Sequence, residues 1–211
     1  PLSRWSKLMA WTSSWIGHNT FMTNPTPPMP PTPHEMEDAM LQQLKTLIRD
    51  VPNFPSEDII FRDITPLMAD PAGLALAVEL MANPFRKAHI DVVLGAESRG
   101  FIFGTAIARA MNVGFIPVRK PGKLPFDTIS QDYELEYGTD TLQIHADAIA
   151  PGQRVLIVDD LVATGGTLVA CRDLVKRLGG EVIGISVLVE LESLGGRDRL
   201  TPDTIHSVLT Y

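Results

Sequence analysis

A segment rich in glycine and threonine, Ala163-Thr-Gly-Gly-Thr167, follows two adjacent carboxylates in this sequence. The two glycines permit positive φ and carry no Cβ, so successive backbone N–H groups can converge on one anion. The two threonines add hydroxyl donors. A phosphate fits such a loop, particularly where the loop leads into the positive end of a helix. The predicted phosphate-binding residues are Ala163, Thr164, Gly165, Gly166 and Thr167.

The carboxylates before the loop, Asp159 and Asp160, would repel a phosphate, but they can accept hydrogen bonds from the vicinal hydroxyls of a sugar. The loop and the two aspartates together therefore predict a ribose 5-phosphate site. The loop lacks the Gly-Lys-Ser/Thr ending of a P-loop, and it does not match a dinucleotide-binding fingerprint.

The elements around this loop alternate between strand and helix. Apolar runs predict strands over 90–95, 114–118, 154–159 and 181–189, with helices over 71–83, 100–111 and 166–178. This alternation predicts an α/β fold in which a doubly wound, mainly parallel sheet is flanked by helices. Asp159 and Asp160 then lie at the carboxyl end of a strand, where open sheets of this kind bind ligands.

The pattern changes between residues 120 and 149. Residues 134–137 and 141–144 alternate polar and apolar side chains around Gly138-Thr-Asp140. This predicts a two-stranded hairpin that stands off the main sheet.

The charge of the chain limits its partners. Its 211 residues hold 18 Lys and Arg against 25 Asp and Glu, a formal net charge of -7. This charge argues against nucleic acid or an anionic membrane as a partner, and no apolar run is long enough for a membrane span. The single cysteine, Cys171, fits a reducing compartment, and we expect a cytoplasmic protein.

An anionic ligand requires a locally basic site, and residues 85–123 offer one against the sign of the whole chain. The basic residues of this stretch outnumber the acidic pair Asp91 and Glu97. They are Arg86, Lys87, Arg99, Arg109, Arg119, Lys120 and Lys123.

The first 34 residues are rich in proline and hold no acidic residue. We expect residues 1–34 to be a leader outside the fold, either a disordered extension, upstream translated sequence or a targeting segment. The domain is expected over 35–211. The capping box Thr32-Pro-His-Glu35 predicts the start of its first helix. Apolar residues then recur at helical spacing from Met36 to Val51.

The run from Val155 to Thr167 resembles the PRPP-binding signature of the type I phosphoribosyltransferases. Other segments between about Met36 and Leu200 resemble the adenine-specific members of that family and occur in the family's order. They are Ile60-Phe-Arg-Asp-Ile-Thr-Pro66, Gly95-Ala-Glu-Ser-Arg-Gly-Phe-Ile-Phe-Gly104, Val118-Arg-Lys-Pro-Gly-Lys-Leu-Pro125, Tyr133-Glu-Leu-Glu-Tyr-Gly138 and Leu188-Val-Glu-Leu-Glu-Ser-Leu-Gly-Gly-Arg197.

This resemblance implies the type I phosphoribosyltransferase fold, with a small hood from about 35–65 and 190–211 and a mobile hairpin lid over about 120–138. It implies a purine salvage enzyme, a homodimer, that joins adenine to the ribose of PRPP and yields AMP and pyrophosphate. Two alternatives stay open: transfer to another purine base, and a non-catalytic PRPP-binding regulator.

The resemblance also implies roles for residues outside the loop. Pyrophosphate, with Mg²⁺, would meet Ser98, Arg99, Arg119, Lys120 and Lys123, and Arg99 would act on the barrier by facing the charge of the leaving group. Substrate oxygens and water would hold most of the Mg²⁺ coordination, with Asp159 and Asp160 as candidate ligands.

The lid would carry the catalytic Glu136, placed near N7 of adenine, with Tyr137 covering the site. By pattern alone Glu134 is indistinguishable from Glu136. Adenine would contact Ile60, Arg62, Leu161 and Leu191, although the aliphatic members of this set also fit the hydrophobic core.

Overall fold

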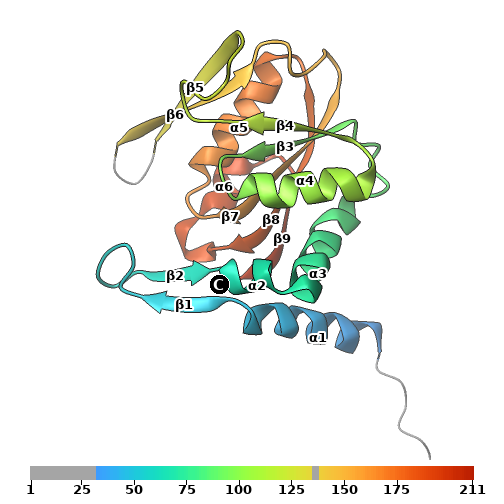
Figure 1. The fold of residues 1–211 in the computed structure, drawn as a ribbon, viewed down its shortest axis with the longest axis vertical. Coiled ribbons are helices and arrows are strands. Elements are labelled where there is room, and N and C mark those ends of the chain that lie inside the picture. Colours follow the sequence, from blue (N-terminus) through green and yellow to red (C-terminus); the bar gives the residue numbers. More distant parts are fainter. Residues whose placement is uncertain (1–31, 135–137) are drawn as a thin grey trace, which may run out of the picture.

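The structure, a computed structural model, describes residues 32–134 and 138–211. Its centre is a sheet of five parallel strands in the order β4-β3-β7-β8-β9 (Figure 1). From β3 the chain adds β4 on one side, then returns to add β7, β8 and β9 on the other. The doubly wound sheet is thereby confirmed. Its strands are β3 (Val92–Ala96), β4 (Gly114–Val118), β7 (Arg154–Val162), β8 (Glu181–Glu190) and β9 (Ile205–Thr210).

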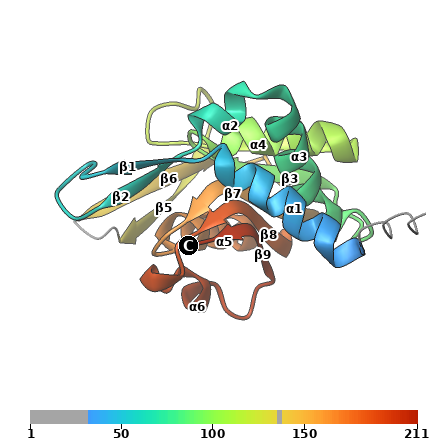
Figure 2. The same ribbon diagram turned by 90° about the horizontal axis from the view of Figure 1, so that it is seen from below.

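Alternate residues of the central strands belong to two hydrophobic cores, one on each face of the sheet. Val93 and Val158 pack among residues of α1 (Pro33–Thr46), α3 (Pro71–Ala82) and α4 (Gly100–Met111). Val92 and Ile157 pack with α5 (Gly166–Arg177) and with a hairpin formed by β5 (Thr128–Glu134) and β6 (Thr139–His145). Figure 2 shows α1, α3 and α4 grouped on one side and α5 on the other. Burial on both faces explains why these strands are almost continuously apolar.

The strand that carries the aspartates is longer than the sequence predicted. The apolar run predicts an end at Asp159, but β7 continues through Asp160 to Val162, in parallel register with β8. The expected helices over 71–83, 100–111 and 166–178 correspond to α3, α4 and α5.

The capping box at the start of α1 is present. The Thr32 N–H donates to Glu35 Oε2 at 2.7 Å, and the Glu35 N–H donates to Thr32 Oγ1 at 3.3 Å. The helix therefore begins at Pro33, just before the expected domain boundary at residue 35. It ends at Thr46, and Val51 lies in a strand rather than on the apolar face of the helix.

A short antiparallel hairpin follows α1 and was not predicted. It pairs β1 (Arg49–Pro52) with β2 (Ile60–Asp63), and α2 (Thr65–Ala69) comes directly after it. The residues of β1 are exposed or half-buried, so the strand lacks the apolar run by which the central strands are recognised.

The second hairpin differs in register from the prediction. Tyr133 pairs with Asp140 and Glu134 with Thr139, so Asp140 belongs to a strand and not to the turn. The first strand of the pair covers 128–134, and the predicted strand residues 135–137 lie outside the described residues. Its sequence is mostly polar, which hides the alternation on which a strand prediction depends.

The expected hood segment 190–211 stays a prediction, and part of it belongs to the main sheet. It contains η2 (Glu192–Leu194) and α6 (Gly196–Leu200), but its last part is β9, an edge strand of the main sheet in parallel with β8. The one remaining element, η1 (Asn83–Phe85), closes α3. Within the described ranges no helix combines the length and the apolar character that a membrane crossing requires.

Candidate active site

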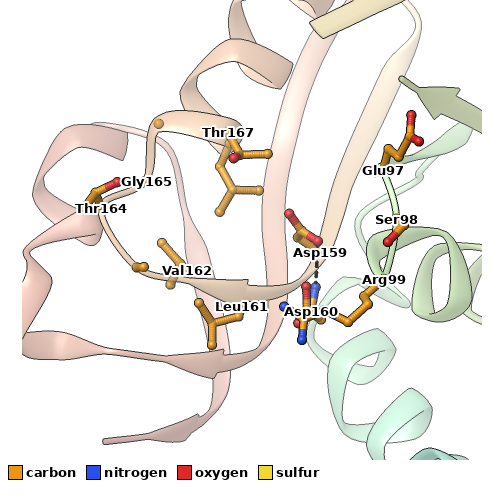
Figure 3. A pocket seen from close by; sticks show the side chains of 13 residues that line it. Glu97, Ser98, Arg99, Asp159, Asp160, Leu161, Val162, Thr164, Gly165 and Thr167 are labelled. Carbon is orange, nitrogen blue, oxygen red and sulfur yellow. Dashed lines mark hydrogen bonds and ion pairs between the residues drawn. The ribbon is translucent and has the colours of Figure 1, made fainter. Parts of the chain in front are cut away.

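A cavity of about 620 Å³ opens at the carboxyl ends of β3 and β7. The strand order reverses between these two strands, and open α/β sheets bind their ligands at this switch point. The turn after β3, the end of β7 and the loop into α5 form the wall (Figure 3). Predicted site residues on this wall are Ser98, Arg99, Asp159, Asp160, Leu161, Ala163, Thr164, Gly165, Gly166 and Thr167.

The loop into α5 has the geometry of an anion cradle. Gly165 is the N-cap of the helix with a φ of 80°, and within the described part of the chain no side chain caps this end. The first N–H groups of α5 are therefore available to a ligand. A Cβ would come within 2.7 Å of a backbone oxygen at both glycines, that of Gly196 for Gly165 and that of Glu134 for Gly166. The backbone around the loop thus leaves no room for side chains at these positions.

The two aspartates lie at the base of the cavity, almost fully buried. Asp159 is 7% exposed and Asp160 is 6% exposed. Burial raises the pKa of Asp159 well above its ordinary value, and the neighbouring Asp160 carboxylate raises it further. Burial also raises the pKa of Asp160, although the Arg99 guanidinium opposes this. Two buried, adjacent carboxylates are stabilised by ligand groups that donate hydrogen bonds or carry positive charge, such as sugar hydroxyls or a cation.

Arg99 reaches these aspartates from the start of α4. Its Nε lies 3.0 Å from Asp160 Oδ2. Figure 3 shows the two side chains next to each other. Gly100 permits this approach, because a Cβ there would lie 2.8 Å from Asp159 Oδ1 and 2.9 Å from the Val158 carbonyl oxygen. The guanidinium also lies 5.5 Å from the ring centroid of Phe61, a β2 residue. An anion that binds Arg99 must therefore share this side chain with Asp160.

The predicted basic residues after β4, Arg119, Lys120 and Lys123, lie outside the cavity wall, and Arg119 and Lys120 have carboxylate partners. Arg119 Nε is 3.3 Å from Glu97 Oε2, which also accepts the Lys120 N–H at 2.9 Å. The Lys120 ammonium forms an ion pair with Asp140 on β6. Burial raises the pKa of Glu97, but the hydrogen bonds from Lys120 and Arg119 outweigh it and leave this pKa below its ordinary value.

The basic stretch from 85 to 123 does not form one site. Arg86 pairs with Glu79 at 2.6 Å and donates to the Ala110 carbonyl oxygen, near the end of α4 remote from the cavity. Arg109 lies in the last turn of the same helix. The expectation of a locally basic site holds only for the residues near Glu97, where carboxylates offset much of the positive charge.

The residues expected around adenine are only partly brought together. Leu161 lines the cavity, whereas Ile60 on β2 is 52% exposed and lies off the wall. Arg62 pairs with Asp50, and its guanidinium lies 4.1 Å from the ring centroid of Tyr211.

Leu191, the fourth residue of this expected set, follows β8. It packs against the hydrophobic core, and its N–H donates to the Val162 carbonyl oxygen at 3.0 Å. The adenine pocket expected from the sequence therefore stays a prediction for Ile60, Arg62 and Leu191.

Glu136 and Tyr137 lie outside the described residues. The strand before them ends at Glu134, whose carbonyl oxygen is the closest neighbour of a Cβ built on Gly166. The end of the β5–β6 hairpin therefore lies against the phosphate-binding loop.

Three residues of the wall were not among the predicted site residues: Glu97, Val162 and Leu168. Glu97 is adjacent to the predicted Ser98 and Arg99, and its position in that turn was the available signal. Val162 was missed because the strand was expected to end earlier. Leu168 belongs to the first turn of α5, where its spacing predicts a core residue.

Comparisons with known proteins agree with this geometry. A family model described as the phosphoribosyl transferase domain matches residues 64–208. The adenine phosphoribosyltransferase of Rhodopirellula baltica is 58% identical over 168 residues, which cover 80% of this chain and 82% of the relative.

Solved structures resemble the fold. The adenine phosphoribosyltransferase of Rhodothermus marinus is 51% identical with a TM-score of 0.79, over 82% of this chain and 99% of that one. The Saccharomyces cerevisiae enzyme, complexed with D-2,5-dideoxy-2,5-imino-altritol 1,6-bisphosphate and adenine, is 39% identical with a TM-score of 0.77, over 82% and 99%. The match extends over the sheet, the phosphate-binding loop and both aspartates, and the chain belongs to the adenine phosphoribosyltransferase family.

Proposed function

We propose that this chain transfers the 5-phosphoribosyl group of PRPP to adenine, with AMP and pyrophosphate as products, in purine salvage. One observation carries the proposal: a single cavity joins an uncapped helix N-terminus to two buried aspartates. Such a cavity fits the ribose 5-phosphate that PRPP and AMP share. The choice of adenine is supported by the relatives, which are adenine phosphoribosyltransferases.

The substrate groups have separate places in this proposal. The 5′-phosphate binds the N–H groups and hydroxyls of residues 163–167, and the vicinal hydroxyls of the ribose donate to Asp159 and Asp160. The pyrophosphate extends towards Ser98 and Arg99, with Arg119, Lys120 and Lys123 beyond them. Cations at this end favour the reaction because negative charge accumulates on the leaving group in the transition state.

In the reaction, N9 of adenine bonds to C1′ of the ribose as the bond from C1′ to the pyrophosphate oxygen breaks. The electron pair of that bond leaves with pyrophosphate. In the proposal, Glu136 exchanges a proton with N7 of adenine, and Tyr137 covers the site. Closure of the hairpin excludes water, which would otherwise hydrolyse the reactive centre.

The residues of the cavity fit a bound Mg²⁺. Asp159 and Asp160 supply carboxylate oxygens, the ligand type that Mg²⁺ prefers, whereas Glu97 is paired with Arg119 and the Lys120 N–H. The described residues hold no cluster of three side chains that could bind a metal, so the protein itself would supply few ligands. The raised pKa values of the two aspartates are a further reason for a cation there. We propose that substrate oxygens and water provide most of its ligands and that the ion, when bound, offsets the charge of the pyrophosphate.

The remaining parts of the proposal concern the setting of the enzyme. We propose a cytoplasmic homodimer whose partners are adenine, PRPP, AMP and pyrophosphate, with neither nucleic acid nor membrane. The acidic balance of the chain and its single buried cysteine support this setting.

A panel of free bases tests the proposal. The chain is incubated with PRPP, Mg²⁺ and either adenine, hypoxanthine, xanthine or guanine, and nucleotide formation is measured. We expect AMP from adenine at a far higher kcat/KM than any other product, and loss of turnover when EDTA removes the metal. Equal use of several bases would contradict the choice of adenine. Binding of PRPP without turnover of any base would favour the regulator.

A further inference from the structure

The short helix α6 lies against the predicted phosphate-binding loop, residues 163–167, and none of its described residues lines the cavity. A Cβ on Gly196 would come within 2.2 Å of the Ala163 carbonyl oxygen and 2.9 Å of the Gly165 nitrogen. Arg199 Nη1 donates to the Thr164 carbonyl oxygen at 3.2 Å. Successive residues of the loop are therefore in contact with α6, and the loop can keep its shape only while α6 keeps its place.

Arg197 fixes that place through all three nitrogens of its guanidinium. Nε donates to Glu190 Oε1 at 2.8 Å, Nη1 to the Ile205 carbonyl oxygen at 3.1 Å and Nη2 to Ser207 Oγ at 2.8 Å. Nη2 also contacts the second oxygen of Glu190. Glu190 ends β8, while Ile205 and Ser207 lie on β9. The side chain thus ties α6 to two strands of the central sheet.

Glu190 is an unusual residue for the end of a buried strand. It is 3% exposed, and the hydrogen bonds from Arg197 hold the pKa of its carboxyl below the ordinary value despite burial. A buried carboxylate is costly unless it is paired, and a forked contact with arginine fixes both partners in direction as well as distance. Neither residue lines the cavity, so no direct contact with a ligand explains the pair.

We infer that Arg197 and Glu190 are positioning residues that hold α6 against the phosphate-binding loop and thereby set the affinity for the 5′-phosphate. This rests on the proposed function for the identity of the ligand. The effect is expected to be specific to the phosphate, because Asp159 and Asp160 belong to β7, which is paired with β3 and β8, and α6 meets this strand at its last residue, Val162. Contacts with the ribose and base are unaffected.

Calorimetric titration with AMP and with adenosine separates these contributions, since the two ligands differ only in the phosphate. Arg197→Gln removes the ion pair, and Arg197→Lys keeps the charge but not the fork. Arg154→Gln is the matched control. Arg154 pairs with Glu181 at 3.1 Å, and these two residues begin β7 and β8, at the end of the strands opposite the cavity. Circular dichroism and thermal unfolding establish that each variant is folded.

We expect Arg197→Gln to weaken AMP binding by about 10-fold or more, the scale of a lost charged hydrogen bond, with adenosine affinity within about 2-fold of the wild type. Arg197→Lys should lie between the two, and Arg154→Gln should change neither affinity. If Arg197→Gln fails to fold, Ser207→Ala removes one hydroxyl of the network and should still weaken AMP selectively, by about 3-fold.

An unchanged ratio of the AMP and adenosine affinities in the folded variants would overturn the inference, as would equal losses for both ligands. These results leave the proposed function standing, provided that the wild type binds AMP. A wild-type chain that does not bind AMP would instead refute the proposed function itself.

Discussion

Gly165 is a residue at which backbone conformation and packing both exclude a side chain. Its φ is 80°, and a Cβ would lie 2.7 Å from the Gly196 carbonyl oxygen. Gly165→Ala should therefore displace the loop and reduce AMP affinity by at least about 10-fold, as calorimetry can measure. Gly152→Ala is the control: Gly152 has a φ of 79° but nothing within 4 Å of a Cβ. Both variants carry the cost of about 1 kcal/mol for a left-handed alanine. Equal AMP affinities in the two variants would show that the packing against Gly196 has no role.

Glu136 has the clearest predicted role in proton transfer. Glu136→Gln keeps the size of the side chain and removes its ability to exchange a proton, so turnover should fall by about 100-fold while PRPP binding persists. Glu134→Gln is the matched control, because this exposed glutamate ends β5 and lies two positions earlier in the sequence. If Glu134→Gln lowers turnover and Glu136→Gln does not, the two carboxylates exchange roles. The sequence pattern alone could not separate them.

Asp159 should favour ligand binding but lower the stability of the folded chain at neutral pH. Its pKa is raised by burial and by Asp160, so the folded chain binds a proton more tightly than the unfolded chain. Stability is then greatest below the ordinary pKa of aspartate and falls as the pH rises through the raised value. Asp159→Asn removes this loss, and we expect a Tm several degrees higher at about pH 7 but little change at about pH 4. AMP affinity should fall in the same variant. A lower Tm at neutral pH would contradict the pKa direction.

The β5–β6 hairpin connects the predicted phosphate-binding loop to the basic segment after β4. Tyr133 on β5 packs beside the phosphate-binding loop, since its ring lies 3.2 Å from a Cβ built on Gly166. Its hydroxyl lies 3.4 Å from Asp140 Oδ2, and the same carboxylate pairs with Lys120. The hairpin therefore contacts both the loop and the basic segment, with Tyr133 on the first side and Asp140 on the second.

This arrangement predicts a competition for Lys120. Asp140 raises the pKa of Lys120 and holds its ammonium off the cavity wall, so pyrophosphate must displace a carboxylate to gain this cation. Asp140→Asn should tighten pyrophosphate binding by about 2- to 5-fold, the range expected for a partly exposed ion pair. Asp132→Asn removes an exposed carboxylate from the same hairpin and should have no effect. Weaker pyrophosphate binding in Asp140→Asn would mean that Asp140 orients Lys120 for the ligand.

The strands and helices differ in how well the sequence predicts them. The central strands β3, β4, β7 and β8 contain apolar runs that the sequence shows directly, and the glycines of the loop after β7 predict a phosphate site there. In contrast, β1 and β5 are short or polar, and β9 begins Ile205-His-Ser. Their places depend on tertiary pairing that periodicity does not encode. The capping box of α1 was predictable because both partners lie within one turn.

A cluster of basic residues in the sequence of this molecule does not become a cluster of unpaired positive charge at the cavity. The basic stretch from 85 to 123 divides between the remote end of α4 and the segment beside Glu97. Arg99, Arg119 and Lys120 each pair with a carboxylate that is close in the structure but far away in the sequence. Tertiary pairing thus determines how much positive charge a ligand meets. The hydrogen bonds of Arg197 that hold α6 also depend on tertiary structure, because β8 and β9 bring Glu190 and Ser207 together.

Two truncations test where the domain begins. The described fold begins with the capping box of Thr32 and Glu35. Removal of residues 1–31 should leave kcat and Tm unchanged if the leader lies outside the fold. Removal of residues 1–36 also deletes the capping box, and because an uncapped helix exposes its first N–H groups, Tm should fall by several degrees. Calorimetric unfolding and the AMP assay measure both effects. A loss of activity in the shorter deletion would place part of the leader in the working enzyme, whereas equal Tm values for the two truncations would show that α1 is held by its packing against the core rather than by its cap.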